Sequence, residues 1–261
     1  MYILELNFEC YRDTSLGEAE PAIVNYLDML RYQGQILGRE FPTSMQDGGF
    51  VSRVVCPEQD SLHPDNQSEQ VALAEQGLHQ AGLLAPKPHL LGMDLLSDST
   101  DPCGQEGERP SWMLLYTSFV HTCSPLRCGD HFAPIPLYRL PAIANGDHKQ
   151  IIKWQEDWEA CDQLQMNGSI AEHAVLHEIS EVGSRLQRRG SDLARRLEGL
   201  CGIPTYYYLY RVGGLSKAAE LARSCPGCGG EWALAAPLHE IFDFKCDPCR
   251  LVSNLSWDFK D

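Results

Sequence analysis

Apolar and polar side chains alternate at the start of the chain, which predicts a half-buried strand over residues 2–8. The apolar positions of this strand are Tyr2, Leu4, Leu6 and Phe8. After Pro21 the apolar residues return at helical spacing, which predicts a helix that ends at Gly38. The apolar stripe of this helix consists of Ile23, Leu27, Leu30 and Leu37.

The following segments complete a predicted N-terminal domain. Residues 50–56, 88–96 and 112–120 are rich in β-forming side chains and predict strands, and residues 68–81 predict a second helix. Residues 97–110 are polar, with Gly and Pro, and predict a loop. The order strand, helix, strand, helix, strand, strand favours an α+β fold that begins with an α/β sandwich over residues 1–141. Helices would cover one face of a sheet, in a ferredoxin-like arrangement.

Residues 142–222 are predicted to form a helical segment with one strand. A helix is expected over residues 151–164, where Trp154 and Trp158 lie one turn apart and are interpreted as core anchors. The strand is expected at residues 205–212, TYYYLYRV, and a short helix capped by Ser216 should follow it.

Between these elements the sequence predicts one long helix. It would begin at a capping box formed by Ser169 and Glu172 and end at Gly202, which is followed by a proline two residues later. Unbroken, this helix would be about 50 Å long. Gly183 and Gly190 disfavour helix, so a kink or a close helix crossing is expected near them.

The composition is that of an ordinary soluble globular protein, with 261 residues, 43% of them hydrophobic and 22% charged. A net charge of -15 argues against a general nucleic-acid coat, because phosphate binding requires Lys and Arg. The first ten residues lack the basic start of a signal peptide, and no apolar run is long enough to span a membrane. We therefore expect a reducing cytoplasmic location and no membrane partner, conditions in which grouped cysteines favour metal over disulfides.

Four of the eleven cysteines form two Cys-x-x-Cys pairs near the C-terminus. They are Cys225, Cys228, Cys246 and Cys249. Two residues between paired cysteines, and the gap of residues 229–245, are typical of a zinc ribbon with four thiolates around one structural ion. The sequence therefore predicts a zinc ribbon over residues 223–261, with iron as the competing metal. Two disulfides would need an oxidising compartment, and a redox motif would explain one pair only.

A second group of metal-binding residue types lies in the stretch HTCSPLRCGDH. It comprises His121, Cys123, Cys128 and His131. The residue types suit zinc, but the spacing is that of neither a knuckle nor a finger, so buried or free thiols are favoured over a second metal. The chain also lacks a Gly-rich phosphate loop, a nucleophile elbow and a His-Glu-x-x-His motif. The sequence predicts no catalytic residue, and an enzyme is not the favoured interpretation.

Three stretches resemble a known family: PTYYYLYRVGG, CPGCGGEW and PLHEIFDFKCDPCRLVSNLSWD. They are similar to an uncharacterised bacterial family described as zinc-ribbon-containing, candidate nucleic-acid-binding proteins. The resemblance runs along the whole chain and is sharpest in its last quarter. It implies that Cys225, Cys228, Cys246 and Cys249 bind zinc, and it brings no catalytic residues.

Two functions follow from these observations. The first is a nucleic-acid-binding accessory protein, supported by basic residues on one face of the predicted long helix, namely Arg185, Arg189 and Arg196. The predicted ribbon itself is acidic, which makes it a poor phosphate clamp. The alternative is a protein-interaction or assembly module with a purely structural zinc. Many apolar residues crowd the last segment and would dock either within the chain or onto a partner.

Overall fold

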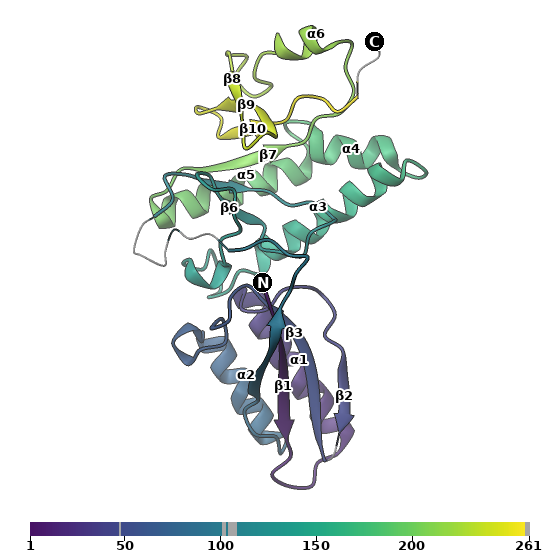
Figure 1. Ribbon diagram of the computed structural model, residues 1–261, viewed down its shortest axis with the longest axis vertical. Coiled ribbons are helices and arrows are strands. Elements are labelled where there is room, and N and C mark those ends of the chain that lie inside the picture. Colours follow the sequence, from purple (N-terminus) through teal and green to yellow (C-terminus); the bar gives the residue numbers. More distant parts are fainter. Residues whose placement is uncertain (47, 101–102, 104–108, 259–261) are drawn as a thin grey trace. The chain divides into compact units, whose positions relative to one another are not determined.

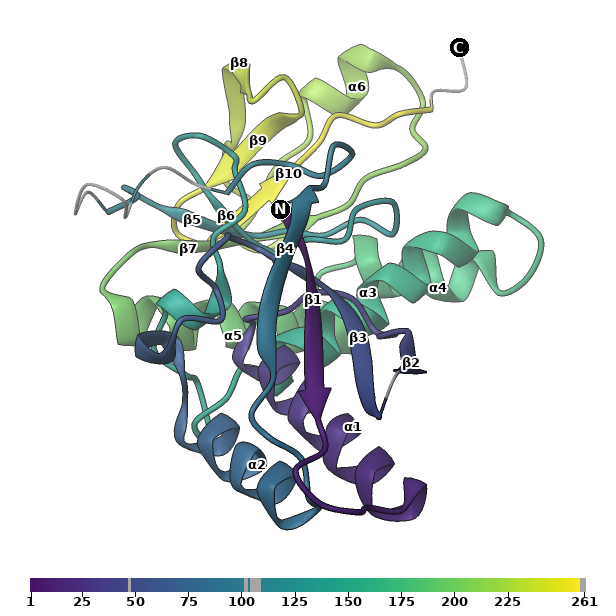
Figure 2. The same cartoon turned by 60° about the horizontal axis from the view of Figure 1, so that its bottom comes forward.

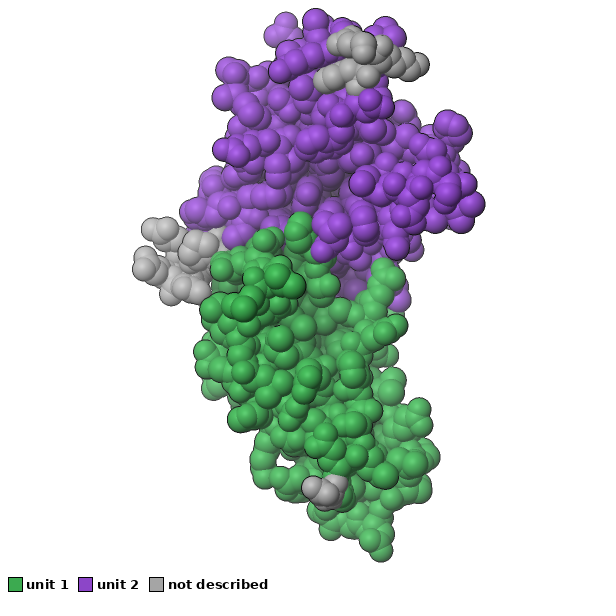
Figure 3. Space-filling view, turned by 45° about the vertical axis from the view of Figure 1, so that its right-hand side comes forward, with its two compact units in different colours: residues 1–100, 121–124, 134–149 green, residues 101–120, 125–133, 150–261 purple. Residues whose placement is uncertain are grey.

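The computed structural model describes residues 1–46, 48–100, 103 and 109–258. It is a mixed α+β protein with two sheets and several helices (Figure 1). The chain divides into two compact units, coloured green and purple in Figure 3. Unit 1 comprises residues 1–100, 121–124 and 134–149, and unit 2 comprises residues 101–120, 125–133 and 150–261. The three-way division at residues 141 and 222 stays a prediction.

Unit 1 contains a four-stranded antiparallel sheet and two helices that lie side by side on one face of it (Figure 2). The strand order is β2-β3-β1-β4, and the order along the chain is β-α-β-β-α-β. Its elements are β1 (Tyr2–Glu9), α1 (Leu16–Gln33), β2 (Thr43–Gln46), β3 (Gly49–Cys56), α2 (Glu69–Gln80) and β4 (Lys87–Met93), with short 3₁₀ turns at Pro64–Asn66 and Leu137–Arg139.

The alternating pattern of the first strand sets the core of unit 1. Leu4, Leu6 and Phe8 point from the central strand β1 toward the helices and are buried, while the intervening residues lie on the other face. They pack against the apolar stripes of both helices. Because each of these elements buries one face only, the periodicity of apolar residues in the sequence predicts the strand and the two helices. The core residues that the two helices contribute are Ala19, Ile23, Tyr26, Leu27, Leu30, Val71, Ala74 and Leu78.

Two details of unit 1 differ from the prediction. Helix α1 begins at Leu16 rather than after Pro21, because Ser15 and Glu18 form a capping box ahead of the proline. It ends at Gln33 with Gly34 as its C-cap, not at Gly38. Strand β2 was not predicted, because all four of its residues are exposed and it has no apolar face to reveal it.

Unit 2 is built on a six-stranded mixed sheet with the order β6-β5-β7-β10-β9-β8. Strand β7 runs parallel to both β5 and β10, and the outer pairs are antiparallel. The strands are β5 (Met113–Leu115), β6 (Leu126–Cys128), β7 (Thr205–Leu209), β8 (Ala233–Leu238), β9 (Phe242–Cys246) and β10 (Leu251–Ser253). The helices are α3 (Lys149–Asn167), α4 (Glu172–Ser180), α5 (Arg185–Cys201) and α6 (Lys217–Leu221).

The strand predicted at residues 112–120 was assigned to the N-terminal sandwich, and this is wrong. It is the short strand β5, which pairs with β6 and β7 in the sheet of unit 2. All three residues of β5 are buried, so the strand has no amphipathic alternation. A fully apolar strand fits the middle of any sheet, and its sequence does not say which one.

The core of unit 2 confirms Trp154 and Trp158 as buried anchors on α3. The ring of Trp154 packs edge-to-face on Tyr207 of the central strand, with 5.8 Å between centroids. Helix α5 lies so close to this pair that a Cβ on Gly190 would come within 2.2 Å of the Tyr207 ring. Gly190 therefore permits the close approach that the sequence predicted near it.

The predicted long helix is two helices, α4 and α5. Gly183 adopts a left-handed φ of 93° between them, a conformation that glycine tolerates best, so the break expected near it is confirmed. Ser184 then caps α5 by accepting a hydrogen bond from the Gln187 amide. The predicted start at Ser169 is wrong, since α4 begins at Glu172 after Ala171. Within the described residues no helix is both long and apolar enough to cross a membrane.

Candidate metal centre

The four C-terminal cysteines, here called the four-cysteine centre, come together from two turns of unit 2. Cys225 and Cys228 precede β8, Cys246 ends β9, and Cys249 lies just before β10. Their four Sγ atoms all lie within 4.8 Å of one another, and those of Cys228 and Cys246 are 3.7 Å apart. A tetrahedral ion with metal–sulfur bonds of about 2.3 Å would hold its sulfurs about 3.8 Å apart. The geometry therefore fits a single four-thiolate metal ion.

The first turn is shaped to present its sulfurs inward. The Gly227 amide donates to the Cys225 Sγ at 3.4 Å, and the Gly229 amide donates to the Cys225 carbonyl at 2.8 Å. A Cβ on Gly227 would come within 2.8 Å of the Cys249 Sγ, so no side chain fits between the two turns. The glycine in Cys-Pro-Gly-Cys is thus a steric requirement of the cluster.

Burial and hydrogen bonding shift the pKa values of three of these thiols. Burial raises the pKa of Cys246 to about 11 and holds the pKa of Cys249 well above its ordinary value. The pKa of Cys228 is lowered, chiefly by a hydrogen bond from the Gly230 amide. The raised pKa values keep the sulfurs of Cys246 and Cys249 protonated at neutral pH. A soft divalent cation replaces those protons and satisfies all four sulfurs at once.

The strands that carry the four-cysteine centre belong to the central sheet of unit 2. Strand β10 pairs with β9 on one side and with β7 on the other, so Leu251 lies opposite Cys246 and opposite Tyr207. Phe242 and Phe244 of β9 are fully buried. The apolar residues of the last segment thus dock mainly within the chain, although Trp257 remains 61% exposed.

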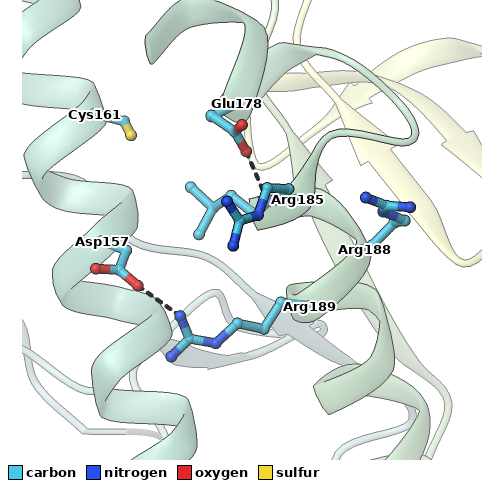
Figure 4. Close-up of a pocket in the computed structure, with 7 residues that line it drawn as sticks. Asp157, Cys161, Glu178, Arg185, Arg188 and Arg189 are labelled. Carbon is cyan, nitrogen blue, oxygen red and sulfur yellow. Dashed lines mark hydrogen bonds and ion pairs between the residues drawn. The ribbon is translucent and has the colours of Figure 1, made fainter. Parts of the chain in front are cut away.

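The three arginines singled out in the sequence lie on the exposed face of α5. Arg185 and Arg189, together with Arg188, line an open pocket of about 510 Å³ between α3, α4 and α5 (Figure 4). The opposite wall carries the carboxylates Asp157 and Glu178. Cys161 and Leu186 complete the lining.

Carboxylates engage two of these three arginines. Arg189 pairs with Asp157 of α3 at 2.5 Å, and Arg196 pairs with Asp192 one turn earlier at 2.9 Å. Glu178 accepts a hydrogen bond from the Leu186 amide at the start of α5. The arginine face is therefore partly neutralised by the protein's own acids, and its excess of positive charge is small.

The second group of metal-binding residue types in the sequence is only partly brought together in the structure. Cys128 and His131 do converge, but the third member of their group is Cys103. His121 and Cys123 fall in unit 1. Cys103 was missed because it is a single cysteine in a polar loop, 25 residues from Cys128. The two-residue spacing from Cys128 to His131 was the one local signal that pointed to this group.

Comparison with known proteins places the chain among bacterial proteins. Three models of domains of unknown function match successive parts of it: DUF8589 over residues 1–92, DUF2310 over residues 107–210 and DUF8594 over residues 214–259. An uncharacterised protein of Haemophilus influenzae is 47% identical over 266 residues, covering 99% of this chain and 100% of that protein. A second uncharacterised protein of Haemophilus influenzae is 50% identical over 182 residues, covering 69% of this chain and 87% of that protein.

These matches give no ligand, partner or reaction for any relative. The match to the first Haemophilus influenzae protein extends over 99% of this chain, and an identity of 47% over that length shows that the two proteins share a fold. The chain therefore belongs to the uncharacterised bacterial family that these two Haemophilus influenzae proteins represent.

Proposed function

We propose that the four-cysteine centre binds one zinc ion, and that the protein is a binding module whose partner-facing surface in unit 2 depends on that ion. The single observation that carries this proposal is the convergence of four sulfurs within 4.8 Å at the end of the sheet that forms the core of unit 2. Zinc is preferred to iron because a four-thiolate site in a ribbon-like pair of turns is the commonest structural use of zinc.

The ion would be structural. Four thiolates fill a tetrahedral shell, so no coordination position remains for water or substrate. Its binding free energy would be folding free energy for the segment that supplies the ligands. Because that segment contributes β8, β9 and β10 to the central sheet, zinc would also protect the edge of β7 that β10 covers.

A protein-interaction role is supported by large apolar side chains that stay exposed in this segment and shortly before it. Trp257 is 61% exposed and Leu215 is 72% exposed. Indole rings in such positions are typical of interaction surfaces, because they supply large contact area at low entropic cost.

The first experiment measures metal content. Wild-type protein freed of any affinity tag should carry zinc, and Cys249→Ser protein should hold one ion fewer. Cys201→Ser changes a cysteine outside both clusters and should leave the zinc content unchanged. Elemental analysis together with hydrogen exchange would report both the ion and the order of β8 to β10. Protein without zinc or iron, or Cys249→Ser protein with full metal, would refute the proposal.

Nucleic-acid binding is the second candidate, and the arginines around the pocket between α3 and α5 favour it. Three guanidinium groups there face two carboxylates, which leaves a net positive charge in a chain of net charge -15. If the protein binds DNA or RNA, replacement of Arg185, Arg189 and Arg196 by Gln should weaken binding. The slope of log K against log salt should also fall by about 2 to 3.

A matched triple in unit 1, Arg39, Arg53 and Lys87 to Gln, removes the same charge elsewhere and serves as the control. Fluorescence anisotropy at low salt would compare the two triples. Absence of binding by wild-type protein would rule the candidate out, and equal losses in both triples would show that the α5 face is not the binding surface.

A further inference from the structure

We infer that unit 2 holds a second zinc site, with Cys103, Cys128 and His131 as three of its ligands. Their ligand atoms form a small triangle. The two Sγ atoms are 4.0 Å apart, and the His131 Nδ1 lies 3.3 Å from the Cys103 Sγ and 3.5 Å from the Cys128 Sγ. In a tetrahedral zinc site two sulfurs lie about 3.8 Å apart, and a sulfur and a nitrogen about 3.5 Å apart. The three distances match these edges.

Hydrogen bonds among the three side chains explain these distances less well than a bound metal ion does. A neutral imidazole Nδ1 has one lone pair and accepts from one thiol, yet both sulfurs approach the same nitrogen. A disulfide is excluded as an explanation, because bonded sulfurs are about 2.05 Å apart. A metal ion with two thiolates and one imidazole uses all three donors together, and zinc accepts this mixture readily.

The turn that carries two of the ligands is firmly built. The Phe132 amide donates to the Cys128 carbonyl, and the Cys128 amide donates to the Ala133 carbonyl, which folds the chain back so that Cys128 and His131 face the same side. Trp112 packs on Gly129, where a Cβ would lie 2.1 Å from the indole ring. Such a turn holds its ligands in place before the metal arrives, and this reduces the entropic cost of binding.

Side chains outside the triangle hold the turn as well. Asp130 accepts two hydrogen bonds from Ser111, through the amide at 2.7 Å and the hydroxyl at 2.5 Å. The His239 Nε2 lies 2.7 Å from the Gly129 carbonyl, and its ring stacks on Phe132. Strand β6 is thereby tied both to the entry of β5 and to the turn between β8 and β9.

Burial distinguishes this group from three chance neighbours on a surface. Cys128 is fully buried and Cys103 is 9% exposed, whereas the exposed His131 closes the triangle from the solvent side. An ion here would bind Cys103 to the turn after β6. It would therefore link two segments that are distant in the sequence, just as an ion in the four-cysteine centre would link two turns toward the opposite edge of the same sheet. One corner of the tetrahedron is left for a fourth donor.

The test counts zinc ions per chain in tag-free protein, for wild type and single variants. Wild type should hold two ions, and His131→Ala should hold one. His131 is exposed, so its replacement by Ala tests ligation without disturbing the core. His131→Cys should retain two ions, because Cys-x-x-Cys in this turn keeps a ligand at the same position. Cys201→Ser should also retain two, and Cys128→Ser should hold one.

X-ray absorption at the zinc edge separates this site from the four-cysteine centre. In Cys249→Ser protein the remaining zinc should show sulfur and nitrogen ligands, whereas in His131→Ala protein it should show sulfur alone. If the proposal for the four-cysteine centre fails, wild type would hold one ion and His131→Ala none, so the two failures differ. A wild-type protein with one all-sulfur zinc, or a His131→Ala protein with two ions, would overturn the second site.

Discussion

Each of the two compact units buries the apolar face of a sheet, but the two differ in how their sheets are stabilised. Unit 1 covers its sheet with the apolar stripes of α1 and α2, and its core consists mainly of aliphatic and aromatic side chains. Unit 2 joins strands from three distant parts of the chain, and the last three of them carry the four-cysteine centre at their ends. Local apolar patterns account for the core of the first unit, whereas the second, with its shorter strands, adds a cysteine cluster that could hold a metal ion.

The largest expected effect follows from removing the proposed zinc ion of the four-cysteine centre, and it should differ between the two units. With a strong zinc chelator, amides of β8, β9 and β10 should lose most of their protection from hydrogen exchange, because structural zinc contributes on the order of 10 kcal/mol to the segments that bind it. Amides of β1 and β3 should keep their protection. Mass-spectrometric hydrogen exchange checks both, and equal loss in the two units would show that they unfold together.

A smaller effect is expected where α5 meets the core of unit 2. Gly190→Ala should destabilise unit 2 by about 3 kcal/mol, because the added methyl group collides with Tyr207 and Trp154. Chemical denaturation of the purified variant measures this difference. Unchanged stability would mean that α5 can shift away from the sheet at no cost, contrary to the close packing that we describe.

The acid sensitivity of unit 1 should come partly from one buried histidine. Burial lowers the pKa of His148 to about 4, whereas its ordinary value is near 6.5, so the folded protein binds the proton less well than the unfolded chain does. The stabilisation is complete above pH 6.5 and is lost as the pH falls from 6.5 toward 4. Between pH 8 and pH 5 this amounts to about 2 kcal/mol.

The measurement compares wild type with His148→Phe, which keeps a ring of similar size but cannot titrate. The variant should lose about 2 kcal/mol less than wild type between pH 8 and pH 5, since all other groups are common to both. Identical pH profiles would show that His148 does not carry the effect.

The smallest effect is expected from a second glycine substitution in α5, which serves as a control for Gly190→Ala. Gly199 of α5 has open space where a Cβ would lie, with no atom within 4 Å. Gly199→Ala should therefore stabilise unit 2 by up to about 1 kcal/mol through helix propensity alone. Opposite signs for the two glycine variants would confirm that packing, and not propensity, makes Gly190 necessary.

The sequence determined much of unit 1 and the four cysteines of the four-cysteine centre. Period-two alternation identified β1 and helical stripes identified α1 and α2, because each of these elements buries one face and exposes the other. Two Cys-x-x-Cys pairs identified the cluster, because the short spacing alone forces each pair of sulfurs to one side of a turn. Both signals are local, and local chemistry is what a single sequence records.

Tertiary structure alone decided which strands meet and which distant thiols converge. All residues of β5 are buried, so its sequence pattern does not indicate which sheet it joins. All residues of β2 are exposed, so no alternation of apolar and polar residues predicts a strand there. Cys103 joins Cys128 and His131 only because the tertiary structure brings together two cysteines that are 25 positions apart in the sequence. Such contacts depend on the path of the whole backbone, so no spacing or periodicity within the sequence could have specified them.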